Sequence, residues 1–295
     1  VMANRSPLAV VLAAAVACMA ATDRLAENGP NLFHAGTEKR VVDSVRSSLA
    51  ARKGSTSGGD GEAPRDAGGE GQVDNAVDLA QFVLEAIDRF CWSQHWMMNI
   101  GEVKGEILDM ALSQRIEAVQ GQQRETPFAA LELGTYIGYS AVRVARLLPL
   151  GATLYACDQV GGYLALARDV VSMAGLSRRV EFLRGTAGEC IRKLASRGRS
   201  LDFVLIDHDK NDYLPSLKAI EEAGLLEQGA AVLADNVMIS GIDDYRDYVR
   251  GSHRYESRSM EAALAYTQEG WRDTIEVSHY NASEWASPEC NSSVR

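Results

Sequence analysis

The stretch "DFVLIDHDK" at residues 202–210 joins an apolar run to a group of ionisable side chains. A short apolar run bounded by polar residues is typical of a buried strand. The residues that follow are unusual for a simple turn, because an aspartate, a histidine, a second aspartate and a lysine occupy four consecutive positions. The pattern predicts a buried strand that ends in a functional site.

Four further apolar runs, separated by stretches with helical periodicity, indicate the rest of the sheet: "AALELG", "TLYACD", "VEFLRG" and "AAVLADN" at residues 129–134, 153–158, 180–185 and 230–236. Helices at residues 79–92 and 101–119 precede them, and residues 253–259 and 273–280 should pair antiparallel at the sheet edge. The expected fold class is α/β: a doubly wound, Rossmann-like sheet, mostly parallel, with an antiparallel C-terminal edge pair. Ligands of such sheets bind at the carboxyl ends of the strands.

Composition excludes several function classes. The chain has 295 residues, of which 46% are hydrophobic, so it can bury one sizeable core. A formal net charge of −10 argues against a nucleic-acid groove, which needs clustered positive charge. The five cysteines are scattered without a CxxC pair, which argues against a disulfide framework or a zinc site. Neither HExxH nor G-x-S-x-G occurs, so zinc proteases and serine hydrolases are disfavoured.

The chain divides into three parts. Residues 8–21, "LAVVLAAAVACMAA", are apolar and end in small residues, so residues 1–25 are expected to be a signal peptide or membrane anchor, with a buried helix or alanine-rich leader as the alternative. The chain would then enter the secretory pathway or be membrane-associated, and would otherwise be cytoplasmic. Residues 26–76 combine a short helix at 37–53 with a flexible Gly/Ser-rich linker at about 53–73. Residues 77–295 form the α/β domain.

The end of the first strand predicts a nucleoside site. In "LELGTYIGYS", Glu132 and Gly134 lie at the strand end, and Gly138 and Ser140 lie where a helix opens. The G-x-x-x-G spacing differs from the dinucleotide fingerprint, so a pyrophosphate is not expected. Asp158 ends the second strand and can accept both ribose hydroxyls. A glycine turn with a helix-capping aspartate is the structural alternative. Together these features favour S-adenosylmethionine.

The fourth and fifth strands predict a metal site. Asp207 follows one strand, and Asp235 with Asn236 follows the other. If the strands are adjacent and parallel, these oxygen-bearing side chains meet at one sheet edge, and such ligands suit Mg²⁺. Lys210 would lie near whatever the metal binds. The alternative is that the aspartates only cap loops and that Lys210 is solvated.

Three long stretches resemble the Mg²⁺-dependent catechol O-methyltransferases, which are class I methyltransferases. They are "VLEAIDRFCWSQHWMMNIGEVKGEILD", "LELGTYIGYSAVRVARLL" and "IDHDKNDYLPSLKAIEEAGLLEQGAAVLADNV", at residues 83–109, 131–148 and 206–237. The resemblance covers roughly residues 77–295, which would be an S-adenosylmethionine-dependent methyltransferase domain. The related caffeoyl-CoA-type enzymes share the acidic metal pattern, but the first stretch looks more like the catechol type.

The resemblance implies a role for each matching residue. Lys210 would be the catalytic base, and the metal ligands would be Asp207, Asp235 and Asn236. The donor would be held by Ile100, Glu132, Gly134, Tyr136, Ser140, Asp158 and His208. The substrate would contact Trp96, Met98, Lys210 and Asn236, although core packing explains Trp96 and Met98 nearly as well.

The chain departs from the family pattern near both ligands. Asp209 stands where the catechol enzymes usually carry a tryptophan beside the adenine. Ala187 and Gly188 replace a polar pair that helps to hold the adenine, and Ser240 replaces a proline of the substrate slot. These changes bear on donor affinity and substrate preference more than on reaction type.

The expected function is methyl transfer from S-adenosylmethionine to one hydroxyl of a Mg²⁺-chelated catechol. The expected partner is a small phenolic substrate, with no nucleic acid, and the expected state is a monomer. In "MEAALAY" the family's late substrate-binding glutamate falls on Ala263 or Ala265, and Glu261 would replace it only if the loop shifts. This leaves two alternatives: a methyltransferase of another phenolic such as a caffeoyl ester, or a donor-binding relative with weakened catalysis.

Overall fold

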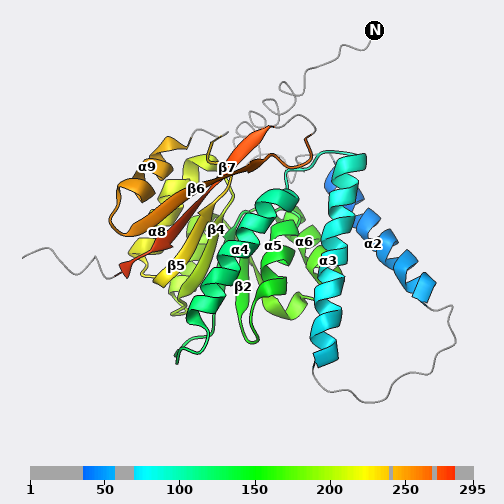
Figure 1. Cartoon of the computed structure of the whole chain (residues 1–295), viewed down its shortest axis with the longest axis horizontal. Helices are drawn as coiled ribbons and strands as arrows, with labels where there is room; N and C mark the ends of the chain where they lie inside the picture. The colour runs from blue at the N-terminus through cyan, green and yellow to red at the C-terminus, as the bar shows by residue number, and fades with distance from the viewer. Residues whose placement is uncertain (1–35, 57–69, 239–241, 268–270, 283–295) are drawn as a thin grey trace, which may run out of the picture.

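A computed structural model describes residues 36–56, 70–238, 242–267 and 271–282 (Figure 1). Its centre is a seven-stranded sheet of order β3-β2-β1-β4-β5-β7-β6. The strands are β1 (Ala129–Leu133), β2 (Thr153–Asp158), β3 (Val180–Arg184), β4 (Leu201–Ile206), β5 (Leu226–Ala234), β6 (Tyr255–Ala263) and β7 (Arg272–Tyr280). The five runs predicted as parallel strands are β1 to β5, and β6 pairs antiparallel with β7. The predicted fold class is therefore confirmed.

Helices cover both faces of this sheet (Figure 1). They are α2 (Thr37–Thr56), α3 (Glu70–Ser93), α4 (Gly101–Val119), α5 (Tyr139–Leu147), α6 (Gly161–Met173), α7 (Ala187–Ala195), α8 (Tyr213–Glu222) and α9 (Asp243–Gly251), with short 3₁₀ turns η1 (Ser177–Arg179) and η2 (Lys210–Asp212). One hydrophobic cluster joins α2 to α6 with one sheet face, and a second joins α7 to α9 with the other.

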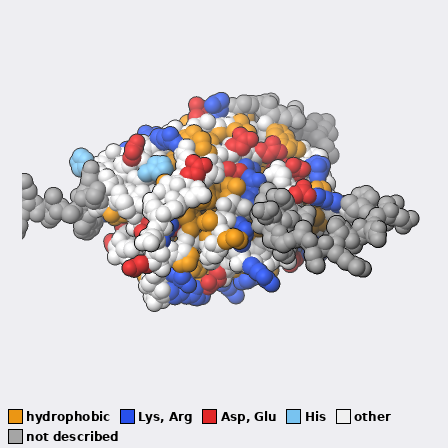
Figure 2. Space-filling view, turned by 60° about the horizontal axis from the view of Figure 1, so that its bottom comes forward, with side chains coloured by type: hydrophobic (Ala, Val, Ile, Leu, Met, Phe, Trp, Pro, Cys, Tyr) orange, Lys and Arg blue, Asp and Glu red, His pale blue; other side chains and the backbone are white. Residues whose placement is uncertain are grey.

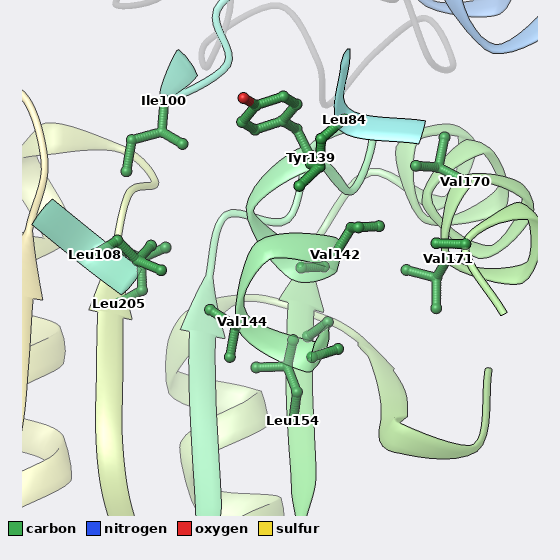
Figure 3. Close-up of a cluster of buried hydrophobic side chains, with 14 of the residues drawn as sticks. Leu84, Ile100, Leu108, Tyr139, Val142, Val144, Leu154, Val170, Val171 and Leu205 are labelled. Carbon is green, nitrogen blue, oxygen red and sulfur yellow. The ribbon is translucent and has the colours of Figure 1, made fainter. Parts of the chain in front are cut away.

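Strand periodicity explains the two clusters. In β4, Phe203 and Leu205 belong to the first cluster, while Val204 and Ile206 belong to the second. Successive side chains of a strand point to opposite faces, so a strand buried on both faces is apolar throughout. Figure 3 shows part of the first cluster, where side chains of α4 and α5 lie over β2 and β4. On the surface drawn in Figure 2, acidic and basic side chains are interspersed with apolar ones.

The register of the parallel strands aligns their carboxyl ends. Leu133 of β1 pairs with Ile206 of β4, and Ile206 pairs with Ala234 of β5. The next residue along each strand therefore begins its loop at the same level of the sheet. The two acidic loops and the glycine turn predicted from the sequence consequently meet at one edge.

The N-terminal expectations are only partly covered by the described residues. The helix predicted at 37–53 is α2, which packs on α3 and α6. α2 and α3 both extend into the range 53–73 that was predicted to be a linker, and residues 57–69 lie outside the described part. The apolar run at 8–21 also lies outside it. None of the helices in the described ranges is long and apolar enough to cross a membrane.

A disulfide that the cysteine spacing did not indicate joins β2 to α7. Cys157 and Cys190 are bonded, with their Cα atoms 6.5 Å apart, and each is 2% exposed. The absence of a multi-cysteine framework did not exclude one tertiary cross-link, because Cα proximity across a βα unit is invisible in sequence spacing. The bond fixes the first turn of α7 beside the end of β2.

Reduction of this bond should lower the free energy of unfolding by about 3–4 kcal/mol, since a loop with a sequence separation of 33 residues regains entropy in the unfolded chain. Urea unfolding with and without a reductant measures the difference. A Cys157→Ala/Cys190→Ala variant is the control, because its unfolding should not respond to the reductant. An unchanged midpoint for the native chain after complete reduction would contradict the expectation.

Candidate active site

The turn after β1 depends on a glycine. Gly134 has φ +93°, and a Cβ built there would lie 2.0 Å from the carbonyl oxygen of Asp207. Only glycine allows the ends of β1 and β4 to approach this closely. Its N–H donates to the Cys157 carbonyl at 2.9 Å, which ties the turn to β2 as well. The predicted glycine turn is therefore a close backbone approach at the centre of the site.

The second glycine of the turn opens α5. Gly138 is the N-cap, has φ +90°, and a Cβ there would lie 3.0 Å from the Cα of Ala167 in α6. The two glycines together let the loop pass between β1 and α6, and they place Ser140 in the first turn of α5. Ile100 lies at the start of α4, where it is 3% exposed.

Asp158 ends β2 and organises this turn. One carboxylate oxygen accepts from the Tyr136 N–H at 2.9 Å, and the other accepts from the Val160 N–H at 2.8 Å. Burial raises the pKa of Asp158 above its ordinary value, and these hydrogen bonds offset part of that rise. Asp158 thus braces the loops after β1 and β2, whereas the N-cap of α6 is Val160, which has no side-chain capping bond. Each oxygen keeps a further lone pair, so these bonds do not exclude a ribose contact.

The Tyr136 side chain points away from this turn. Its backbone has φ +47°, while its ring packs edge-on against Tyr163 at 4.8 Å and its hydroxyl lies 3.4 Å from Glu38 of α2. Of Tyr136, the backbone N–H therefore contributes to the turn, and the ring helps to hold α2 on α6.

Glu132 is a buried carboxylate in β1. It is fully buried, and no hydrogen bond of good geometry reaches either oxygen. Burial raises the pKa of Glu132 to about 7, and the nearby hydroxyls of Ser140 and Thr135 offset only part of this effect. Such a group is stabilised in its charged form by any cation that enters beside it.

Two side-chain oxygens from neighbouring strands converge on one lysine. Lys210 Nζ lies 3.1 Å from Asp207 Oδ1 and 3.3 Å from Asn236 Oδ1. It also donates to the hydroxyl of Tyr213, which in turn donates to the Asp235 carbonyl at 3.0 Å. The ends of β4 and β5 therefore lie together, and of the three predicted metal ligands Asp207 and Asn236 face Lys210, whereas the Asp235 carboxylate faces a different lysine.

Asp235 faces a buried lysine that the sequence reading missed. Lys104 of α4 is 2% exposed, and its Nζ lies 2.6 and 2.8 Å from the two Asp235 oxygens and 3.2 Å from Asp273 Oδ2. Burial alone would lower the pKa of Lys104, but the two carboxylates outweigh it and raise that pKa. Burial and the neighbouring carboxylates raise the pKa of Asp235 to about 6. The charged residues of the stretch "EVKGE" are typical of a solvated helix face. Only the tertiary contacts with Asp235 and Asp273 show that Lys104 is a buried, paired lysine.

His208 packs flat against an aromatic ring beside the acidic loop. Its ring is stacked on Tyr213 at 5.3 Å, and its Nε2 lies 2.9 Å from Ser216 Oγ. Burial, and then the charge of Lys210, lower the pKa of His208 to about 4, so the ring is neutral near pH 7. Nδ1 is buried and has no hydrogen-bond partner among the described residues.

The predicted substrate walls are also packing residues. Trp96 and Met98 are partly buried against the first hydrophobic cluster. Trp96 Nε1 donates to the Ala265 carbonyl at 3.0 Å, and a Cβ on Gly101 would lie 2.3 Å from the Ala265 Cβ. The loop after β6 therefore lies tightly against the start of α4.

Most positions that depart from the family pattern lie among the described residues, and each has a definite place in the fold. Asp209 caps η2 by accepting from the Asn211 N–H at 3.0 Å. Ala187 and Gly188 are the first two residues of α7. Glu261 lies on β6, where it is half exposed and paired with Arg272 at 2.6 Å. Ser240 lies outside the described residues.

The residues at this edge fit a hard cation in their chemistry. No group of three or more His, Cys, Asp or Glu side chains is arranged as metal ligands within the described ranges. The donor set here is instead two carboxylates and one amide oxygen, and two of these oxygens already converge on the ammonium of Lys210. Oxygen donors gathered around a positive charge are the arrangement that Mg²⁺ requires.

Comparison with known proteins gives a family and a fold. Residues 74–265 match the family model described as O-methyltransferase. The chain is 40% identical to catechol O-methyltransferase B of Danio rerio over 190 residues, 64% of this chain and 68% of that one. It is also 40% identical to the catechol O-methyltransferase of Mus musculus over 188 residues, 63% and 67% of the two chains. An O-methyltransferase of Streptomyces achromogenes, solved with SAM, superposes with a TM-score of 0.54 at 20% identity, over 70% of this chain and 90% of that one.

Proposed function

The chain belongs to the O-methyltransferase family that includes the catechol O-methyltransferases and is an S-adenosylmethionine-dependent O-methyltransferase, and we propose that its acceptor is a Mg²⁺-chelated vicinal diphenol. One observation carries the proposal. The side-chain oxygens of Asp207 and Asn236 converge on Lys210 at the carboxyl edge of the sheet, directly beside the glycine turn. A proton acceptor, oxygen ligands and a cofactor turn therefore lie together.

We assign the donor to the loop between β1 and α5. The turn at Gly134 packs against the Asp207 backbone at the end of β1, and Glu132 would supply a buried negative charge for the ammonium and sulfonium groups of the methionine portion. Asp158 would accept from the ribose hydroxyls, and the neutral His208 would lie near the adenosine. Ile100, Ser140 and the backbone of Tyr136 would complete the wall around the methionine portion.

We assign the metal to Asp207, Asp235 and Asn236. When bound, Mg²⁺ would supply the positive charge that lowers the pKa of a chelating phenol. Asp207 is partly exposed and faces Lys210, so its carboxylate is accessible from the acceptor side. Asp235 is ion-paired with the buried Lys104, which compensates the negative charge of its carboxylate in the interior. Both carboxylates are thus held in place by protein cations.

Lys210, in its neutral amine form, is the residue placed to take the acceptor's proton. Its Nζ lies between Asp207 and Asn236, so an acceptor oxygen held by those residues comes within reach of the amine. Trp96 and Met98 would exclude water from one side of the slot and orient the acceptor. Holding the oxygen and the donor methyl in a near-attack arrangement then accounts for much of the rate.

The alternative acceptor is a different phenolic, such as a caffeoyl ester. The pairing of Glu261 with Arg272 on β6 supports keeping this alternative, because it engages the one glutamate that could take the place of the family's late glutamate. Ala263 and Ala265 offer no side-chain acceptor for a second hydroxyl. The loss of the late glutamate also supports the other alternative, a donor-binding relative with weakened catalysis.

The first test is a methylation panel. Vicinal diphenols, matched monophenols and caffeoyl esters are incubated with S-adenosylmethionine, with and without a chelator, and methylated product is measured. Diphenols should be methylated, monophenols should react much less, and the chelator should abolish turnover. Reaction of caffeoyl esters alone would select the alternative acceptor, and donor binding without product on any phenol would select the weakened relative.

A second test separates the base from the metal ligands. Lys210→Ala should lose about 10²- to 10⁴-fold in rate and recover partly at high pH, where the acceptor ionises without help. Asp207→Asn should show no such recovery.

Asp207 is a better choice than Asp235 for the metal-ligand variant, since loss of Asp235 would leave the positive charge of the buried Lys104 undercompensated. Asp212→Asn, an exposed change on the same turn, is the matched control. Full activity of Lys210→Ala near neutral pH would exclude its role as base.

A third test concerns donor affinity. Because burial raises the pKa of Glu132 to about 7, the donor-free carboxyl is mostly protonated below that pH. A cationic donor favours the ionised form, so the affinity for S-adenosylmethionine should be greatest above pH 7 and should fall by up to about tenfold per unit as the pH falls below it. Calorimetry on the native chain and Glu132→Gln measures this. The variant should bind more weakly and show a flat profile, and an equally steep profile in the variant would contradict the assignment.

A further inference from the structure

The amide of Asn236 has a defined orientation. Its Nδ2 donates to Asp273 at 2.6 Å, and its Oδ1 faces Lys210 Nζ at 3.3 Å. An amide has its donor and acceptor on opposite sides, so the partner of one atom decides where the other points. The residue has φ +60°, a left-handed conformation that asparagine tolerates better than most residues.

Asp273 is placed beside Asn236 by the sheet. It lies at the start of β7 and is fully buried. The loop that leaves β5 stays attached to β7, because the Val237 N–H donates to the Thr274 carbonyl at 3.1 Å. This backbone contact holds the two side chains in register.

Lys104 anchors the carboxylate of Asp273. Its buried ammonium lies 3.2 Å from Asp273 Oδ2, and it also bridges to both oxygens of Asp235. An ionised carboxylate only accepts hydrogen bonds. An Asn236 amide turned the other way would bring two oxygen atoms together in the interior and leave a donor without its partner, an arrangement that proteins avoid.

We propose that Asp273 is a positioning residue that acts through Asn236, turning its Oδ1 toward Asp207 and the metal site, with Lys104 as the anchor. The inference rests on the proposed function, in which Asn236 is a metal ligand. Outer hydrogen-bond partners that orient ligands typically change metal affinity by about 10- to 100-fold when they are removed. The competing reading is that Asp273 and Lys104 form an ion pair that only stabilises the fold.

The experiment measures Mn²⁺ binding without donor or acceptor. Mn²⁺ substitutes for Mg²⁺ at oxygen sites and reports free and bound ion by electron paramagnetic resonance. Asp273→Ala should weaken Mn²⁺ binding by about 10- to 100-fold, because it removes Oδ2, the oxygen that accepts from both Asn236 Nδ2 and Lys104, and leaves the Asn236 amide without the partner that orients it. Donor affinity should be unchanged, since the donor loop lies on β1 and β2.

A double-mutant cycle separates positioning from stability. Asn236→Gly removes the ligand and suits the positive φ, and adding Asp273→Ala to it should change Mn²⁺ affinity by less than about threefold. Glu276→Gln is the control on the same strand, because Glu276 is also fully buried and ion-paired, with Arg250 at 2.8 Å. It should lower the melting temperature and leave Mn²⁺ affinity unaltered. Asp273→Ser, which also removes the carboxylate, replaces Asp273→Ala if that variant does not fold.

Three results would overturn the inference. Near-native Mn²⁺ affinity in folded Asp273→Ala would show that Asp273 does not position Asn236, while the metal site itself would stand. Additive losses in the double variant would show that Asp273 acts by another route. Absence of Mn²⁺ binding by the native chain would overturn both this inference and the proposed metal, so the two failures are distinguishable.

Discussion

The close approach of Gly134 to the backbone of Asp207 is the constraint on which the site depends. A side chain at this position would collide with the Asp207 carbonyl, and the ends of β1 and β4 would have to separate. Because β1 pairs with both β2 and β4, that separation would move the ribose-side and metal-side loops apart. A single missing Cβ thus allows the donor turn and the acidic loop to share one edge of the sheet.

Charge compensation is the second requirement of this edge. Asp207, Asp235 and Asp273 lie close together in a largely buried region, where unpaired carboxylates are costly. Lys104 approaches from the core side and Lys210 from the open side, so each face of the cluster has one cation. The inner lysine is fully enclosed with its two carboxylates, and the outer one is partly exposed.

The adenosine side of the site is built differently. Its helix, α7, begins with small residues and is held to β2 by the Cys157–Cys190 bond next to Asp158. The capping box of Thr186 and Glu189 fixes the first turn of that helix from within. Placement of α7 therefore relies on the disulfide and on the hydrogen bonds of this capping box.

The sequence by itself determined the strands and the chemistry at their ends. The apolar runs were recognisable because a strand buried on both faces must be apolar throughout, and the end of β4 stood out because four ionisable residues, 207–210, follow it directly. Only the tertiary structure decided which distant residues serve those ends. Lys104, Asp273 and the cysteine pair come from separate segments, and nothing in their local spacing marks them. Their roles arise from register and burial, which bring a charge or a thiol to its partner only after the chain has folded.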